Sequence, residues 1–111
     1  MAEEARNKPR YKISLNDSVD DEHVIQATPV LDFDLFGELI GIEILNYKFV
    51  TGLKNLSFEH TNKGIVRISF DEQADALYLK ILNERSSDQE TANGNIIVDS
   101  RGKLIRLEVI G

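Results

Sequence analysis

The chain has 111 residues, of which 41% are hydrophobic and 29% are charged, and its net charge is −6. This length fits one domain with one core, because two separate half-length domains would each bury too little surface to be stable. The lack of cysteine excludes disulfides, thiolate zinc sites and thiol nucleophiles, and the acidic balance argues against unassisted nucleic-acid binding, which depends on Lys and Arg.

Residues 1–10 mix charged residues with Ala, Asn and Pro and predict a flexible leader, followed by a single domain over residues 11–111. Charges stand where a signal peptide needs an apolar run, and no stretch approaches the roughly 18 apolar residues of a membrane span. We therefore expect a cytoplasmic protein without a membrane partner.

The first half of the domain predicts one strand and one hairpin. Residues 11–15 alternate between apolar and polar side chains, as in a half-buried strand, and an acidic loop follows through residues 20–22. Residues 30–33 and 39–45 predict a hairpin around the turn 34–37, whose Asp and Gly suit a type I turn with a bulge. The segment 39–45 is nearly all aliphatic, which predicts a central strand covered on both faces.

The second half predicts a helix and two more hairpins. Residues 47–56 place apolar groups at helical spacings and predict a short helix, which Gly52 weakens. The polar residues 84–95 predict an exposed, mobile loop. The strands of the two further hairpins are predicted at 66–70 with 76–82 and at 96–98 with 104–110. The predicted fold class is therefore α+β, predominantly antiparallel β.

Residues 34–45 and 99–110 align without a gap and are identical at five of twelve positions. Turn chemistry and apolar pattern are both preserved, so we expect two related hairpin units, 11–56 and 65–111, to share one core with the short helix between them. With a small shift, Tyr11, Leu15 and Asn16 also align with Tyr78, Leu82 and Asn83. The strand at 66–70 has no counterpart before Tyr11, which predicts an exposed sheet edge that must be covered, charged or paired.

Residues 70–79, Phe-Asp-Glu-Gln-Ala-Asp-Ala-Leu-Tyr-Leu, resemble the opening signature of the bacterial family called domain of unknown function 2283. Its closing signature, an Asp, two residues and a Gly before an aliphatic strand, resembles residues 34–45 and, with Arg106 in place of Gly41, residues 99–110. Members of this family are mostly uncharacterised, and some lie beside small toxin-like genes. The resemblance therefore implies a partner or antitoxin role and no catalytic residue.

Several carboxylates are candidates for metal binding. Asp32 and Asp34, with Asp99 or Glu43, offer oxygen atoms of the kind that bind Ca²⁺ or Mg²⁺. A calcium loop needs several such oxygens close in sequence, whereas Asp34 and Asp99 are already explained as turn residues. We therefore expect no metal site.

Other carboxylates have structural explanations. Asp71 and Asp75 bracket a turn and are expected to cap it, because a general acid and base pair would need burial to separate its pKa values. Glu43 and Glu108 each lie in a largely apolar strand and are expected to form ion pairs across strands. The candidate cations for these pairs are Arg67, Lys80 and Arg106.

The histidines and aromatic residues predict no site. His23 and His60 have no partner at metal-ligand spacing and are expected at the surface. Tyr47, Phe49 and Phe58 are expected to pack into the core rather than to stack on bases. Because Gly-x-Ser-x-Gly and glycine-rich phosphate loops are also missing from the sequence, we expect no cofactor and no catalytic residue.

The sequence favours a binding or assembly module that uses a sheet edge or the helix face. Its partner is expected to be a second copy, as in a homodimer or another homo-oligomer, or a different protein. Two alternatives stay open. One is an antitoxin-like neutraliser whose acidic surface, residues 17–23 included, covers a small basic toxin. The other is a small-ligand or enzyme domain that uses Glu43, Glu108 and nearby carboxylates.

Overall fold

The computed structural model of the chain describes residues 9–17, 21–61 and 64–111, so residues 1–8 of the expected leader and residue 20 of the expected acidic loop lie outside the described residues. The described residues form two antiparallel sheets and one short helix, which confirms the predicted fold class. In spatial order, sheet A consists of β1 (Tyr11–Ser14), β9 (Leu104–Val109), β8 (Gly94–Val98) and β2 (His23–Ala27). Sheet B consists of β5 (Arg67–Asp71), β6 (Ala76–Lys80), β4 (Leu39–Leu45), β3 (Val30–Phe33) and β7 (Asp88–Thr91).

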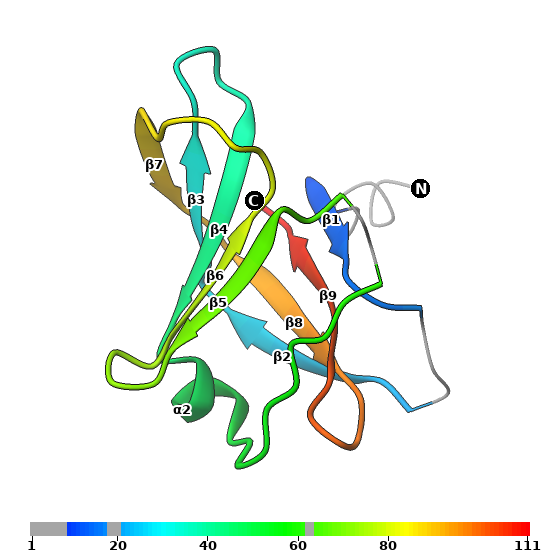
Figure 1. Cartoon of the computed structure of the whole chain (residues 1–111). Helices are drawn as coiled ribbons and strands as arrows, with labels where there is room; N and C mark the ends of the chain where they lie inside the picture. Colours follow the sequence, from blue (N-terminus) through cyan, green and yellow to red (C-terminus); the bar gives the residue numbers. More distant parts are fainter. Residues whose placement is uncertain (1–8, 18–20, 62–63) are drawn as a thin grey trace.

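Each sheet combines strands from both units of the sequence. In sheet A, the hairpin β8–β9 of the second unit lies between β1 and β2 of the first. In sheet B, the hairpin β3–β4 of the first unit lies between β6 and β7 of the second, and β5 adds an outer strand. Figure 1 shows β1, in blue, beside β9, in red. The two units are therefore intertwined, and neither sheet can form from one unit alone.

The chain passes between the sheets at two bends. Residues 28–29 join β2 of sheet A to β3 of sheet B, and residues 92–93 join β7 of sheet B to β8 of sheet A (Figure 1). The bends are bonded to each other, because the Ala92 N–H donates to the Pro29 carbonyl at 2.9 Å. Strands that switch sheets in this way form the corners at which two packed sheets meet.

One hydrophobic core lies between the sheets, as predicted. Its buried side chains come from every central strand and include Leu31, Ile42, Leu77, Leu79, Ile96, Leu104, Leu107 and Val109. Near the helix, the rings of Tyr47, Phe58 and Phe70 pack together, with centroids 5.4 to 6.1 Å apart. Because both sheets contribute to the same cluster, the two units share their stabilising apolar surface.

The helix α2 (Tyr47–Thr51) begins at the predicted residue and ends at Gly52, whose φ of 69° stops it. Its first free N–H groups, those of Lys48 and Phe49, donate to the Asp75 carboxylate at 2.8 and 3.2 Å. The helix buries only Tyr47, and Phe49 is 86% exposed, so the prediction that Phe49 packs into the core is wrong. No helix in the described part of the chain is long or apolar enough to cross a membrane.

The hairpins β3–β4 and β8–β9 have the same local geometry. In each turn the Asp carboxylate, of Asp34 or Asp99, accepts the main-chain N–H groups two and four residues later, all at 2.9 Å. The turn glycines have positive φ, 82° at Gly37 and 86° at Gly102. A register shift also occurs at the same place in the first strand of each hairpin. These are the features predicted for a type I turn with a bulge.

Strand pairing corrects the sequence alignment of the flanking strands by one residue. Glu43 lies opposite Tyr78 in sheet B, whereas the aligned Glu108 lies opposite Lys12 in sheet A. Tyr78 therefore corresponds to Lys12 and not to Tyr11. The next residues follow this register. In sheet A the N–H groups of Leu15 and Asn16 both donate to the Ile105 carbonyl. In sheet B the N–H groups of Ile81 and Leu82 donate in the same way to the aligned Ile40 carbonyl. Among the described residues, β5 has no counterpart beside β1.

Two strands, β2 and β7, were not predicted. β7 lies inside the segment 84–95, so the prediction of an exposed loop there is wrong for these residues. All four residues of β7 are exposed, and in β2 the exposed apolar Val24 adjoins the half-buried Ile25, so neither sequence alternates clearly between apolar and polar residues. Both are outer strands whose conformation comes from main-chain pairing with β8 and β3. The units consequently contain four and five strands instead of three and four.

Candidate functional site

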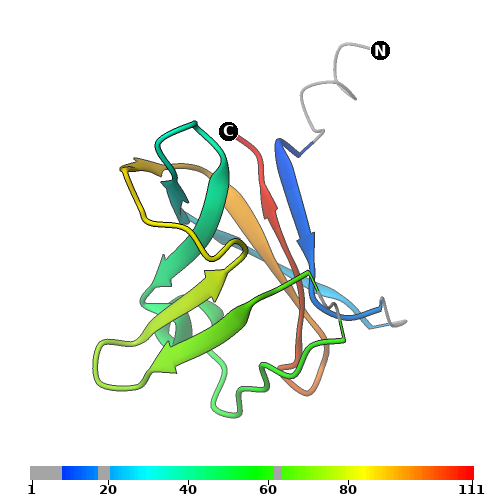
Figure 2. The ribbon, with the colours of Figure 1, turned by 45° about the horizontal axis from the view of Figure 1, so that its top comes forward.

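The turn between β3 and β4 carries two exposed apolar side chains at its tip. Leu35 is 79% exposed and Phe36 is 87% exposed. The Asp34 carboxylate fixes the turn through the Phe36 and Glu38 N–H groups, and the Asp34 carbonyl accepts the Gly37 N–H at 3.1 Å. Figure 2 shows this turn projecting from sheet B. Adjacent apolar side chains held in water on a fixed turn are typical of an interaction site.

A hollow of about 280 Å³ lies beside this tip. One wall is the tip, and the other is the loop between β6 and β7; the lining residues are Asp34, Leu35, Phe36, Glu84, Arg85, Ser86 and Ser87. The loop is bonded to the sheet, because the Ser87 N–H donates to the Phe33 carbonyl at 2.8 Å. We define the tip 34–37, the hollow and the loop 84–87 as the open end of sheet B.

Asp32 anchors this loop to the sheet through a buried polar network. The Asp32 carboxylate, in a residue only 5% exposed, accepts hydrogen bonds from the Tyr78 hydroxyl at 3.0 Å, the Gln89 amide at 2.7 Å and the Ser86 hydroxyl at 3.4 Å. Among the described residues it has no ion pair. A buried carboxylate without a cation needs several donors, and these three neutral groups supply them. The network therefore holds the second wall of the hollow in place.

Gly41 makes this network possible. It lies beside Asp32 in the sheet, and a Cβ atom at residue 41 would collide with the Tyr78 hydroxyl. Without a side chain there, Tyr78 lies across β4 and reaches Asp32. Sheet A has Arg106 and Ile97 at the aligned positions, so it lacks this arrangement. Burial, followed by the hydrogen bond and charge of Asp32, raises the pKa of Tyr78 to about 12.

We expect alkaline conditions to weaken the fold between pH 10 and about pH 12. The pKa of Tyr78 rises on folding from 10.0 to about 12, and burial also raises the pKa of Tyr47. Each tyrosine holds its proton more tightly when folded, so its contribution is complete below pH 10 and is lost as the pH rises towards 12. Denaturant unfolding at neutral pH and at about pH 11 measures this loss. Tyr78→Phe should lose less stability than the parent chain over that interval, and an equal loss would exclude a role for the Tyr78 hydroxyl.

The matching end of sheet A is covered by the segment that connects α2 to β5. Asn55 places its carbonyl against Gly102, where a Cβ atom would collide with it. Ser57 forms a parallel bridge with Lys103, and its carbonyl accepts the Leu104 N–H at 3.1 Å. Figures 1 and 2 both show this green segment beside the orange turn of β8–β9.

The same segment continues in extended form past the end of β1. The Glu59 carbonyl accepts the Asn16 side-chain amide at 2.7 Å, and the Thr61 N–H donates to the Leu15 carbonyl at 2.9 Å. Every second residue from 55 to 61 therefore contacts this end of sheet A. As a result Gly102 and Leu104 are buried, whereas their counterparts Gly37 and Leu39 are exposed and half-buried.

The predicted turn aspartates lie where expected, with one exception. Asp71 accepts the Gln73 and Ala74 N–H groups at 3.0 and 3.2 Å, which caps its own turn. Asp75 instead caps α2. Asp32 and Asp34 do not form a common site, because Asp32 accepts hydrogen bonds in the buried polar network and Asp34 accepts those of its own turn. Within residues 9–17, 21–61 and 64–111, no three His, Cys, Asp or Glu residues are grouped closely enough to hold a metal ion.

Among the described residues, neither strand glutamate forms the ion pair expected across strands, since the cation bound by Glu108 lies in the same strand, β9. Glu108 binds Arg106 at 3.1 Å, and Arg106 also binds Glu22 at 2.8 Å. Hydrogen bonding to Glu22 is the largest of the effects that raise the pKa of Arg106. Glu43 is half-buried opposite Tyr78 and has no ion pair among the described residues. Glu108 thus shares a cation with one other carboxylate, that of Glu22, and within the described residues neither strand glutamate belongs to a group of three metal-binding side chains.

The histidines also lie apart from one another. His23 begins β2, in what was expected to be the acidic loop, and its Nε2 lies 3.1 Å from the Asp21 carboxylate. His60 is exposed in the connecting segment. Neither contributes to the open end of sheet B.

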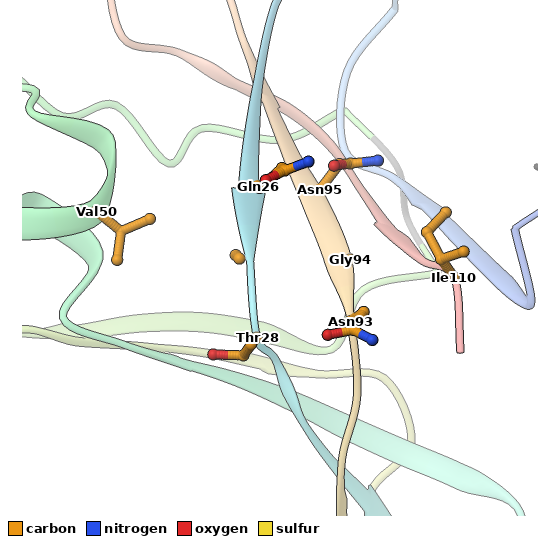
Figure 3. Close-up of a pocket in the computed structure, with 8 residues that line it drawn as sticks. Gln26, Thr28, Val50, Asn93, Gly94, Asn95 and Ile110 are labelled. Carbon is orange, nitrogen blue, oxygen red and sulfur yellow. The ribbon is translucent and has the colours of Figure 1, made fainter.

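A second hollow, of about 510 Å³, lies near the bends between the sheets (Figure 3). Gln26 and Asn95, which are register partners on β2 and β8, line it together with Asn93, and Val50 of α2 lies on the other side of β2 in this view. None of its lining residues is charged. It therefore offers hydrogen-bonding groups without an acid, a base or a metal ligand.

Sequence reasoning missed Leu35 and Phe36 as site residues, although the aligned hairpins contain a signal. The aligned turn has Ser100 and Arg101, which are ordinary residues for an exposed turn. The Asp and Gly of the turn are the same in both hairpins, whereas the two positions between them are large and apolar in one hairpin only. This difference indicates that the two tips contact different surroundings.

Residues 67–111 match the model of a protein family described as "Protein of unknown function (DUF2283)". The matched range contains β5 to β9, which confirms the resemblance drawn from residues 70–79. The first unit, including residues 34–45, lies outside the match. Neither curated proteins nor solved structures give a significant match.

Proposed function

We propose that this protein is a protein-binding module whose contact site is the open end of sheet B. The observation that carries the proposal is the exposure of Leu35 and Phe36 on a turn fixed by Asp34, beside a hollow of about 280 Å³. A fixed tip loses little conformational freedom when a partner covers it. Aromatic side chains at the centre of a contact also carry a large share of binding energy.

Charge around the tip favours a basic partner. Asp34, Glu38 and Glu84 lie at or beside the hollow, against one cation, Arg85, among its lining residues. The whole chain has a net charge of −6. Complementary charge speeds association and selects among partners. An antitoxin-like neutraliser of a small basic toxin is a special case of this proposal.

The outer strands of the sheets support docking less well than the tip does. The connecting segment is bonded at the end of β1, and α2 lies near β2. The outer strands of sheet B carry exposed charges, which are Asp88 and Glu90 on β7 and Arg67 and Asp71 on β5. Covers and charges of this kind protect sheet edges against pairing with another chain. Self-association through an outer strand is therefore less well supported than binding of a partner at the tip.

A matched double variant tests the proposal. Leu35→Ser combined with Phe36→Arg copies the residues of the aligned turn at 100–101, so stability should stay within about 0.5 kcal/mol of the parent chain. Partners recovered by affinity purification from the native cells should bind the double variant at least tenfold more weakly, measured with the purified partner.

Phe49→Ser is the control, because Phe49 is equally exposed on another part of the surface. It should leave partner affinity unchanged. Equal affinity of the parent chain and the double variant for every recovered partner would refute the proposal.

A further inference from the structure

We infer that the open end of sheet B receives an extended, basic segment of another protein, which docks beside the start of β4 as residues 55–61 dock on the end of sheet A. This inference rests on the proposed function and specifies the form and chemistry of the partner. Its basis is that two hairpins with the same geometry have different surroundings: one end is covered by the chain itself and the other is bare.

The bare end offers the same main-chain groups as the covered one. Leu39 corresponds to Leu104, whose N–H binds the Ser57 carbonyl, and the matching register directs the Leu39 N–H away from β3 in the same way. Ile81 corresponds to Leu15, whose carbonyl accepts an N–H from the segment. A docked strand can therefore repeat both hydrogen bonds.

The residues that carry these groups, Leu39 and Ile81, are half-buried, and the positions beside them are less filled than at sheet A. No atom lies within 4 Å of a Cβ atom built on Gly37, whereas the equivalent position at Gly102 is blocked by the connecting segment. The Ile81 carbonyl accepts no main-chain hydrogen bond among the described residues. Leu82 is 37% exposed, although its counterpart Asn16 is buried and bonded to the segment. The bare end thus has room and unused bonding capacity where the other end is filled.

The hollows beside the two turns are also equivalent. The hollow at sheet A, of about 610 Å³, is lined by the turn residues 99–101 and 103, by Asp21 and, in addition, by Ser57 and Glu59 of the connecting segment. The hollow at sheet B is lined by Asp34, Leu35 and Phe36, which align with residues 99–101, and by the loop 84–87. What the open end lacks, relative to its counterpart, is the docked segment.

The side chains define the chemistry of the missing segment. At sheet A, Glu59 of the docked segment lines the same hollow as two cations of the hairpin, Arg101 and Lys103. At sheet B the position of Lys103 is taken by Glu38, and Leu35 and Phe36 replace Ser100 and Arg101. The occupant that fits is an extended segment with apolar side chains and a Lys or Arg where the connecting segment has Glu59.

Two synthetic peptides provide the test. One copies residues 53–61, Leu-Lys-Asn-Leu-Ser-Phe-Glu-His-Thr, and the other carries the Glu59→Lys replacement. Titrated into the isotope-labelled full chain, the Glu59→Lys peptide should shift the amide signals of Gly37, Leu39 and Leu82 to saturation. The unchanged peptide should bind about threefold more weakly, because its carboxylate faces Glu38.

The Leu35→Ser, Phe36→Arg double variant is the control and should show no saturable shift. Three results would overturn the inference. The first is that no shift saturates. The second is that the shifts centre on Leu104, because the peptide then displaces the chain's own segment, and the third is that the same amides shift on dilution without peptide, because a second copy is then the occupant. If the peptides fail but the double variant still loses its partner, the proposed function stands without this mode of docking. If neither measurement shows an effect, both are wrong.

Discussion

Gly102→Ala should destabilise the protein by about 3 kcal/mol or more, whereas Gly37→Ala should cost about 1–2 kcal/mol. Both glycines have nearly the same positive φ, 86° and 82°, so the strain of placing a side chain on that backbone is common to both variants. Only at Gly102 would the new Cβ atom also collide with the Asn55 carbonyl and push the connecting segment away from the end of sheet A. Chemical denaturation of both variants measures the difference.

The pair of variants isolates the contribution of the docked segment, because the backbone strain cancels. Gly102→Ala should also increase hydrogen exchange at Leu104, whose N–H binds the Ser57 carbonyl. Equal destabilisation by the two substitutions would show that the segment contributes little to the fold.

Asp32→Ala should destabilise the protein by about 2–4 kcal/mol. The substitution removes the acceptor shared by Tyr78, Gln89 and Ser86 and leaves the partly buried Tyr78 hydroxyl without its partner. The loop 84–87 should then move away from the sheet, so partner binding at the open end should weaken as well. Thermal or denaturant unfolding gives the first effect, and partner affinity gives the second.

Asp34→Ala is the matched control for stability. Asp34 is two residues away and also accepts hydrogen bonds, but its bonds lie in an exposed turn where water can replace them. It should cost about 1 kcal/mol. A loss at Asp32 no larger than the loss at Asp34 would contradict the idea that the buried network anchors the loop.

The sequence predicts the features of this fold that are encoded locally. The turn at 34–37 and its aligned copy at 99–102 follow from Asp and Gly at fixed positions, because those residues are needed for a particular backbone geometry. The start of α2 follows from its apolar spacing, but the predicted end at residue 56 is wrong, because the helix stops at Thr51 before Gly52. The central position of β4 follows from its continuous aliphatic run.

Features that depend on contacts distant in sequence could not be predicted in this way. The exposed residues of β7 become a strand only because β3 provides a pairing partner. The exchange of strands between the sheets has no local signature. The same apolar faces would be buried whether each unit formed its own sheet or the units exchanged strands. Phe49 follows the buried Tyr47 by two residues, which is about 200° around a helix, so it lies on the face of α2 that points away from the core. Sheet B has an open end because the connecting segment covers the hairpin of sheet A and not that of sheet B. This choice depends on contacts that are distant in sequence.

The pairing of β1 with β9 also determines when the protein can fold during its synthesis. β1 ends at Ser14, and its partner strand spans Leu104–Val109, so sheet A has no central hairpin until residue 109 has left the ribosome. Until then the apolar faces of β3 and β4 have no second sheet to cover them. A chain whose native contacts are this distant in sequence is expected to fold slowly and to need protection from aggregation while it is being made.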